Sequence, residues 1–270
     1  MLSSMYSGIS GLNASTQRMA VIGDNIANVN TTAYKSSELS FESLVNQSVG
    51  GYTGQEIGGG VLLGDLSYDW NQGTIQRTSN PYDMAIAGSG FFMVKDAAGN
   101  AYYTRDGEFS FDAAGNLETS SGMTVQGSLY PPADPPVPVA IVIDPALYQD
   151  VSVDENGVYW GVTKVVAPAV GVKTALFQAV ICDTTDRSVM AKTNKNLFTK
   201  TTNDATDPLI IGIPQTNGLG GVESTSLEMS NVDIAKEFVN MITAQRAFSA
   251  NSKVITTSDE MLQELVNIKR

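Results

Sequence analysis

The chain has 270 residues, with 16 basic and 28 acidic side chains, no histidine and one cysteine, Cys182. These counts exclude a histidine-based catalytic triad, a cysteine-rich metal centre and an intrachain disulfide. The formal charge of −12 also argues against nucleic-acid binding, because neutralising phosphates requires clustered Lys and Arg.

The negative charge is concentrated in the middle of the chain. Residues 1–34 carry one basic and one acidic side chain, and residues 231–270 carry five of each, so both ends are neutral. The whole excess therefore lies in residues 35–230. This partition predicts neutral ends that face protein and an acidic middle that faces water.

Residues 2–28 are predicted to form a helix that is surrounded by other helices. Apolar residues recur at spacings of three and four, which is a heptad seam. The rest of the surface is mostly Ser, Asn, Gln, Gly and Ala rather than Glu and Lys, and such small residues allow close approach; a weakly charged surface helix is the alternative. The apolar seam positions are Leu2, Met5, Ile9, Leu12, Met19 and Ile26.

Residues 35–80 are predicted to be an extended, Gly-rich linker. The stretch Gly50–Gly64 alone contains seven glycines, which is typical of a flexible connection. Because the linker starts at residue 35, residues 1–34 are assigned to the N-terminal helical segment, which we expect to act in assembly with other helices.

Residues 81–229 are predicted to be a central, mostly-β domain. Two copies of Asp-Ala-Ala-Gly-Asn, at 96–100 and 112–116, are turn signals between alternating segments. We expect a β-meander over 84–127, with strands at Met84–Ala87, Phe91–Lys95, Ala101–Arg105, Glu108–Phe111 and Leu117–Thr119. Further strands are expected at Val151–Val153, Val158–Val162, Ala175–Cys182 and Leu209–Ile213.

Residues 230–270 are predicted to be a second assembly helix, running over 231–268. Ser230 with Asp233 three residues later is a variant of the N-terminal capping box. A periodic helix of this length is typical of coiled coils or assemblies. Its apolar seam is Ile234, Phe238, Met241, Phe248, Ile255 and Leu262. The expected fold class is α+β, with both terminal helices paired as a coiled-coil-like core.

No motif for catalysis, a cofactor or a metal stands out. Gly88-Ser-Gly90 breaks the dinucleotide fingerprint, the Asp/Asn/Gly turns lack the ligand pattern of an EF-hand, and Cys182 fits a buried, inert thiol. No apolar run is long enough to span a membrane, and residues 1–12 lack the features of a cleaved signal peptide. We therefore expect no enzyme activity, no cofactor and no membrane insertion, with a secreted carboxylate-based enzyme or a coiled-coil binding module as remote alternatives.

Residues 24–35 read Asp-Asn-Ile-Ala-Asn-Val-Asn-Thr-Thr-Ala-Tyr-Lys. This segment resembles the N-terminal signature of the bacterial flagellar rod and hook axial proteins. Tyr103–Phe109 and the stretch from Ser230 to Arg246 also resemble that family. Two residues depart from its pattern: Asp24 replaces Asn, and Ala33 replaces Gly, which predicts strain if that position needs a positive φ. The signature residues are Asn25, Ala27, Asn28, Thr31, Tyr34 and Lys35.

The resemblance implies a structural subunit that assembles into a helical homopolymer. It further implies neighbouring flagellar axial and junction proteins as partners, and export through the flagellar export apparatus without signal cleavage. The opening Met1–Gly8 and the short connection from Phe41 to Gly58 favour the hook, a universal joint outside the cell. The alternative is the distal rod, a drive shaft that lies in the periplasm.

Overall fold

The computed structural model describes residues 2–44, 47–48, 56–57, 59–133, 135–164, 171–193, 195–201 and 208–268. The chain divides into two compact units. The helical unit comprises Met1–Asn30, Lys35–Asn71 and Val232–Arg270, and the β unit comprises Thr31–Tyr34 and Gln72–Asn231. The fold class is α+β, as the sequence predicts.

The helical unit contains two long helices and a narrow ribbon of strands. Helix α1 spans Leu2–Ala27 and helix α2 spans Ile234–Ile268, close to the predicted ranges. The predicted cap at Ser230 is wrong, because Asp233 itself accepts hydrogen bonds from the amides of Ala235 (2.8 Å) and Lys236 (3.2 Å). A carboxylate at this position satisfies orphan amides and complements the helix dipole, so α2 begins after it.

The predicted linker contains regular strands. Strand β1 (Ser37–Ser43) pairs antiparallel with β4 (Val61–Tyr68), and short β2 (Gln47–Ser48) pairs with β3 (Glu56–Ile57). Much of the glycine-rich stretch lies outside the described residues. The ribbon was missed because its alternation is weak: Val61-Leu62-Leu63 is an apolar run, and a register shift interrupts the ladder between Leu39 and Phe41.

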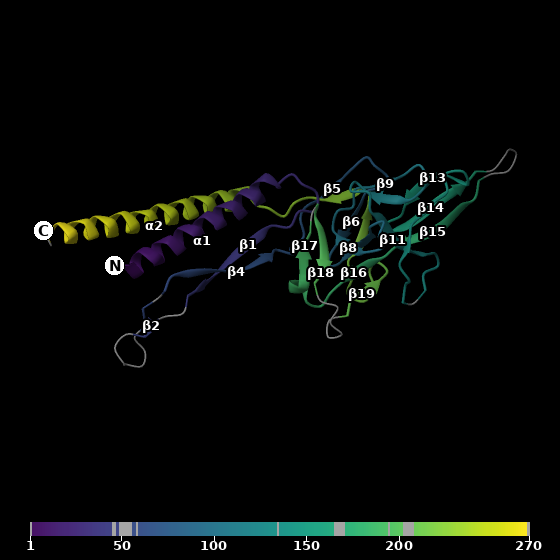
Figure 1. Cartoon of the computed structure of the whole chain (residues 1–270). Helices are drawn as coiled ribbons and strands as arrows, with labels where there is room; N and C mark the ends of the chain where they lie inside the picture. The colour runs from purple at the N-terminus through teal and green to yellow at the C-terminus, as the bar shows by residue number, and fades with distance from the viewer. Residues whose placement is uncertain are drawn as a thin grey trace. The chain divides into compact units, whose positions relative to one another are not determined.

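The β unit is a large arrangement of antiparallel strands (Figure 1). Its 13-stranded sheet follows the order β13-β14-β15-β11-β7-β8-β18-β17, with β9, β10, β12, β16 and β19 attached beside that path. The bounds are β5 Ile75–Arg77, β6 Met84–Ala87, β7 Phe91–Lys95, β8 Ala101–Thr104, β9 Phe109–Phe111, β10 Leu117–Thr119, β11 Thr124–Leu129, β12 Val139–Ala140, β13 Tyr148–Val153, β14 Val158–Thr163, β15 Lys173–Ala179, β16 Ile181–Asp183, β17 Met190–Lys192, β18 Leu197–Lys200, β19 Ile210–Gly212, β20 Gly221–Ser224 and β21 Ser226–Glu228.

Strand positions in the β unit were predicted better than their partners. The strands β6, β7 and β10 occupy the predicted residues, but the predicted meander over 84–127 is wrong in two places. A meander would pair β6 with β7 and β8 with β9. Instead, β6 pairs with β20, and β8 pairs with β18 and β7. The predicted strand 175–182 is two strands, β15 and β16. These partners lie far along the chain, so no local pattern indicates them.

The β unit encloses one hydrophobic core. Met84, Phe92, Phe109 and Tyr159 are at most 1% exposed and belong to this cluster.

The repeated Asp-Ala-Ala-Gly-Asn segments form tight turns, in which Asp96 and Asp112 accept hydrogen bonds from the backbone amides four residues later (2.8 Å each). Hydrogen bonds from the Asn100 and Asn116 side chains lower the pKa of these two carboxyls.

Candidate assembly surface

The two long helices lie antiparallel, side by side (Figure 1). Near one end the hydroxyl oxygens of Ser4 and Ser258 are 3.4 Å apart. Near the other end the Asn25 side-chain amide donates to the Glu237 carboxylate at 3.5 Å. Because both pairs join the start of one helix to the end of the other, the helices run in opposite directions along this whole contact.

The face of α1 that contacts α2 is made of small residues. Gly8, Gly11 and Ser15 are buried, and they repeat at heptad spacing. A side-chain carbon added at Gly8 would lie 3.0 Å from Ile255 Cγ1, and one added at Gly11 would lie 2.6 Å from the Asn251 side chain. The glycines therefore allow the two helices to approach closely.

The predicted apolar seam of α1 lies about a quarter turn away from this small face, since successive residues are about 100° apart around a helix. Met5, Leu12, Met19 and Ile26 are half-buried, and Ile9 is 44% exposed. The side chain of Leu2 lies outside the described residues. The seam is thus left partly uncovered by α2.

The predicted seam of α2 is split between two surroundings. Met241, Ile255 and Leu262 are half-buried on the side that carries the buried Glu237, Ala244 and Ser258. Ile234, Phe238 and Phe248 are 45%, 51% and 38% exposed.

Further apolar side chains of the helical unit are also exposed. The prediction missed them because a single seam uses one residue in three or four, whereas pairs such as Phe238-Val239 and Leu265-Val266 place apolar groups on more than one face. On the helices they are Tyr6, Val239, Ile242, Val254, Met261, Leu265, Val266 and Ile268. On the β1–β4 ribbon they are Phe41, Val61, Leu62, Leu63 and Leu66.

Asn25, from the signature segment, joins three elements of the helical unit. Its side chain is 2% exposed and donates to the Ser37 carbonyl (2.9 Å), while its oxygen accepts from the Ser37 amide (3.0 Å). The same amide group reaches Glu237 on α2. Asn25 therefore fixes strand β1 and both helices together. At the C-terminal end of α1, the Asn28 side-chain amide donates a hydrogen bond to the Asp24 carbonyl (2.9 Å). The signature residue Ala27 is exposed.

Two further signature residues are buried. Lys35, in the helical unit, is 2% exposed and donates from Nζ to the Asn71 carbonyl at 2.8 Å. Tyr34, in the β unit, is 1% exposed, and Lys192 Nζ lies 4.1 Å from its ring centroid. Thr31, also in the β unit, is half-buried. Lys35 and Tyr34 thus act in packing, although the signature alone does not indicate burial of a lysine.

Ala33 has a left-handed backbone conformation, with φ of 55°. Its amide donates to the Glu228 carbonyl at 2.8 Å, and its side chain is 1% exposed. This conformation agrees with the predicted strain, because residues with a side chain disfavour the left-handed region, whereas glycine adopts it readily.

The β unit contains a buried ion pair that the sequence does not predict. Arg105 Nη1 lies 3.3 Å from Glu228 Oε2, and the side chains are 2% and 0% exposed. Glu228 Oε1 accepts from the Gly73 amide at 2.9 Å, and the Arg105 guanidinium lies 5.3 Å from the Phe91 ring centroid. Burial lowers the pKa of Arg105, against the attraction of Glu228. The partner residues are 123 positions apart.

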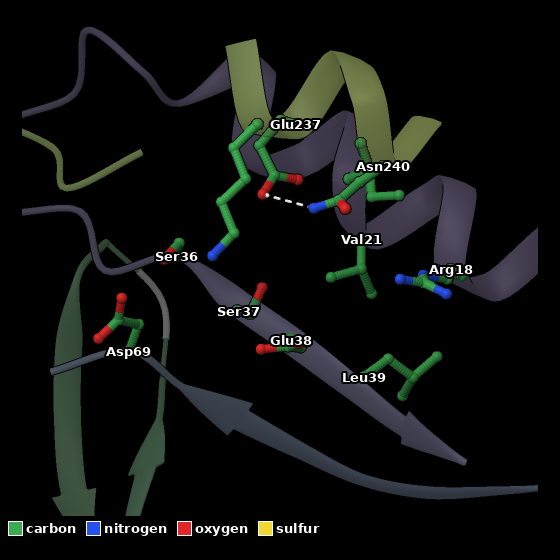
Figure 2. A pocket seen from close by; sticks show the side chains of 11 residues that line it. Arg18, Val21, Ser36, Ser37, Glu38, Leu39, Asp69, Glu237 and Asn240 are labelled. Carbon is green, nitrogen blue, oxygen red and sulfur yellow. Dashed lines mark hydrogen bonds between the residues drawn. The ribbon is translucent and has the colours of Figure 1, made fainter. Parts of the chain in front are cut away.

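A polar hollow of about 100 Å³ lies within the helical unit (Figure 2). Figure 2 shows Glu237 joined to Asn240, on α2, by a hydrogen bond of 3.3 Å. The hollow is lined by Arg18, Val21, Ile22, Ser36, Ser37, Glu38, Leu39, Asp69, Lys236, Glu237 and Asn240.

The described part of the chain contains no group of three or more Cys, Asp or Glu side chains that could hold a metal ion. Neither helix, over its described residues, is long and apolar enough to span a membrane. Cys182 is buried, and burial raises the pKa of its thiol.

Three family models match successive parts of the chain. Residues 5–35 match "Flagella basal body rod protein", residues 85–159 match "Flagellar hook protein FlgE/F/G D1 domain", and residues 223–268 match "Flagellar basal body rod FlgEFG protein C-terminal". The flagellar basal-body rod protein FlgG of Bacillus subtilis is 36% identical over 285 residues, covering 100% of both chains. The chain belongs to the flagellar rod and hook axial protein family. Its members are structural proteins of the bacterial flagellum that polymerise with neighbouring flagellar components.

The comparisons reverse the predicted order of hook and rod. The rod protein FlgG of Borreliella burgdorferi is 31% identical, again over 100% of both chains. The hook protein FlgE of Treponema pallidum is 40% identical, but over only 138 residues, which are 47% of this chain and 30% of that protein. The match to the hook protein is therefore partial, whereas rod proteins match from end to end. The chain is a structural flagellar axial subunit that is more similar to rod proteins.

Proposed function

We propose that this chain is a rod subunit, which forms a straight drive shaft in the periplasm by stacking helically with copies of itself. Full-length similarity to rod proteins supports the choice of rod over hook. In this proposal segments 1–34 and 230–270 are assembly helices, and 81–229 is the outer β domain. Neighbouring axial and junction proteins cap the stack, and the export apparatus delivers the unfolded chain.

The exposed apolar surface of the helical unit carries this proposal. Among the described residues, 17 of the 24 exposed large hydrophobic side chains belong to that unit. Monomeric proteins rarely expose much apolar surface in one region, so we expect these side chains to be covered by another chain. Residues 1–34 suit this burial because they carry only two charged side chains, and charged groups there would have to lose water.

Copies of the same chain are the proposed cover. We infer that the helix pair of each subunit meets the pairs of its neighbours through the seam residues, and that together they form a coiled-coil-like inner layer. The small face of α1 is already used by α2, which leaves the apolar seam for the contact between subunits. Apart from buried side chains such as Asp83 and Glu228, the acidic residues between 35 and 230 would then face water.

A charge placed on the exposed seam tests the proposal. Phe238→Asp should raise the critical concentration for polymerisation at least about 100-fold, because an unpaired charge buried between helices costs several kcal/mol. Leu12→Asp should act in the same way. Light scattering measures the assembly, and electron microscopy identifies straight filaments for a rod and curved ones for a hook.

Val137→Asp is the matched control, since Val137 is 62% exposed in the β unit. This variant should assemble within about twofold of the wild-type chain, because its new charge stays in water. Normal filaments from Phe238→Asp, or a block by Val137→Asp alone, would place the subunit contact on the β unit and contradict the proposal.

A further inference from the structure

Glu237 is a buried carboxylate that makes no ion pair with any side chain the structure describes. Its side chain faces the polar hollow, and the residue is 8% exposed. Its oxygens accept from the amides of Asn25 (3.5 Å) and Asn240 (3.3 Å), both at the long limit of a hydrogen bond. Among the described side chains, no Lys or Arg lies within 4.0 Å of this carboxylate. A buried charge is costly unless it is paired, so this arrangement is suited to an incoming cation.

The hollow has the charge and size to receive that cation. Its lining contains three carboxylates, from Glu38, Asp69 and Glu237, and two cations, from Arg18 and Lys236. The lining therefore carries one excess negative charge. A volume of about 100 Å³ exceeds the space that one water molecule needs, about 10–15 Å³, several times over. One charged side-chain head fits these properties.

Arg246 is an exposed cation of the same helix, and no acidic residue lies within one turn of it along α2. It follows the buried Ala244 by two residues, or about 200° around the helix, so it lies on the side opposite α1. Between Glu237 and Asp259, helix α2 contains no acidic residue. Arg246 makes no ion pair with any described side chain. Each copy therefore carries both an acceptor hollow and an unpaired cation that faces outward.

We propose that Arg246 of one copy enters the hollow of the adjacent copy and pairs with Glu237 there. This inference rests on the proposed self-assembly and names a specific contact within it. Arginine suits the site because its planar guanidinium donates two parallel hydrogen bonds to one carboxylate and is more weakly hydrated than an ammonium. Since donor and acceptor lie on different surfaces of one chain, the contact is head-to-tail and propagates through a helical polymer.

Charge reversal tests the pair between molecules. Glu237→Arg alone and Arg246→Glu alone should each raise the critical concentration about 30-fold or more, because each leaves like charges facing one another. An equimolar mixture of the two variants should polymerise near the wild-type concentration. In the mixture the two reversed side chains face one another with opposite charges, and the unchanged Glu237 of one variant meets the unchanged Arg246 of the other. A mixture that assembles no better than its components overturns the pairing.

The matched control uses Lys253→Glu in place of Arg246→Glu. Lys253 is a cation seven residues further along the same side of α2. Its mixture with Glu237→Arg should fail to assemble, and rescue there would assign the contact to Lys253 and overturn this proposal. Glu237→Gln and Arg246→Gln give a second measurement if reversal prevents folding. The Arg246 substitution should have no further effect in the Glu237→Gln chain, and additive effects overturn the pairing. Failure of the wild-type chain itself to polymerise would instead reject the proposed function.

Discussion

The two units of this chain use apolar side chains in opposite ways. Among the described residues, the β unit contains 26 of the 29 buried hydrophobic residues, and the helical unit contains only Ala14, Ile22 and Ala244. The exposed large hydrophobic groups show the reverse distribution. The β unit therefore has a hydrophobic core of its own, whereas many apolar side chains of the helical unit stay exposed in the single chain.

This contrast separates folding from assembly. Helices gain most of their stability from packing an apolar face, so α1 and α2 are expected to be only marginally stable before neighbours cover them. The chain also places one tryptophan in each unit, Trp70 in the helical unit and Trp160 in the β unit. Fluorescence of single-tryptophan variants can thus report on each unit separately.

The largest expected effect is on the β unit alone. Arg105→Met leaves Glu228 buried without its cation and should destabilise this unit by about 3–5 kcal/mol. Urea unfolding, followed through Trp160 in a Trp70→Phe background, measures the loss. The double variant Arg105→Met/Glu228→Gln should recover much of it, because the glutamine side chain still accepts from Gly73. A single variant with wild-type stability would show that the pair is not essential to the β unit.

The next effect is confined to the helix pair. Gly11→Leu should cost about 1–3 kcal/mol, because the added side chain must displace Asn251 and separate the helices. Hydrogen exchange of α1 amides in the full chain measures this change. Gly23→Leu is the control, since a carbon added there meets nothing within 4 Å. Equal loss of protection in both variants would mean that the small face does not hold the helices together.

Alkaline pH should weaken the β unit through Tyr103. Burial, together with the nearby Cys182 thiol, raises the pKa of Tyr103 to about 12, whereas the unfolded chain has a tyrosine pKa near 10. The unfolded chain loses this proton first, so stability falls as pH rises above 10 and stops falling near 12. Tyr103→Phe should lose less stability than the wild-type chain between pH 9 and pH 11 in urea unfolding. Parallel curves for the two chains would contradict this assignment.

The smallest effect concerns the strained backbone. Ala33→Gly should stabilise the β unit by about 0.5 kcal/mol, since relief of the left-handed strain exceeds the entropy that glycine adds to the unfolded chain. Ala33→Val should destabilise it, because a β-branched residue is more strained there. Thermal unfolding ranks the three chains, and the reverse order would show that the buried methyl group matters more than φ.

The sequence predicts local features of both units well and their partners poorly. Helix bounds and several strands, such as Met84–Ala87, follow from periodicity and turn residues that lie within a few positions of one another. The sequence predicts a linker in place of the β1–β4 ribbon because the apolar residues of the ribbon do not alternate regularly with polar ones. That the seam residues form an assembly surface remains a prediction. The structure leaves two of them, Ile234 and Phe238, exposed.

By itself, the sequence determined that the ends are helical and neutral, that the middle is acidic and β-rich, and that the family signature is present. These properties depend on composition and short-range spacing. Only the tertiary structure decided that α1 meets α2 through glycine and serine, that Arg105 pairs with Glu228, and that Glu237 is buried with no described Lys or Arg within 4.0 Å of its carboxylate. Those facts depend on contacts between residues far apart in the chain, where close packing and burial, rather than local preference, fix the partner.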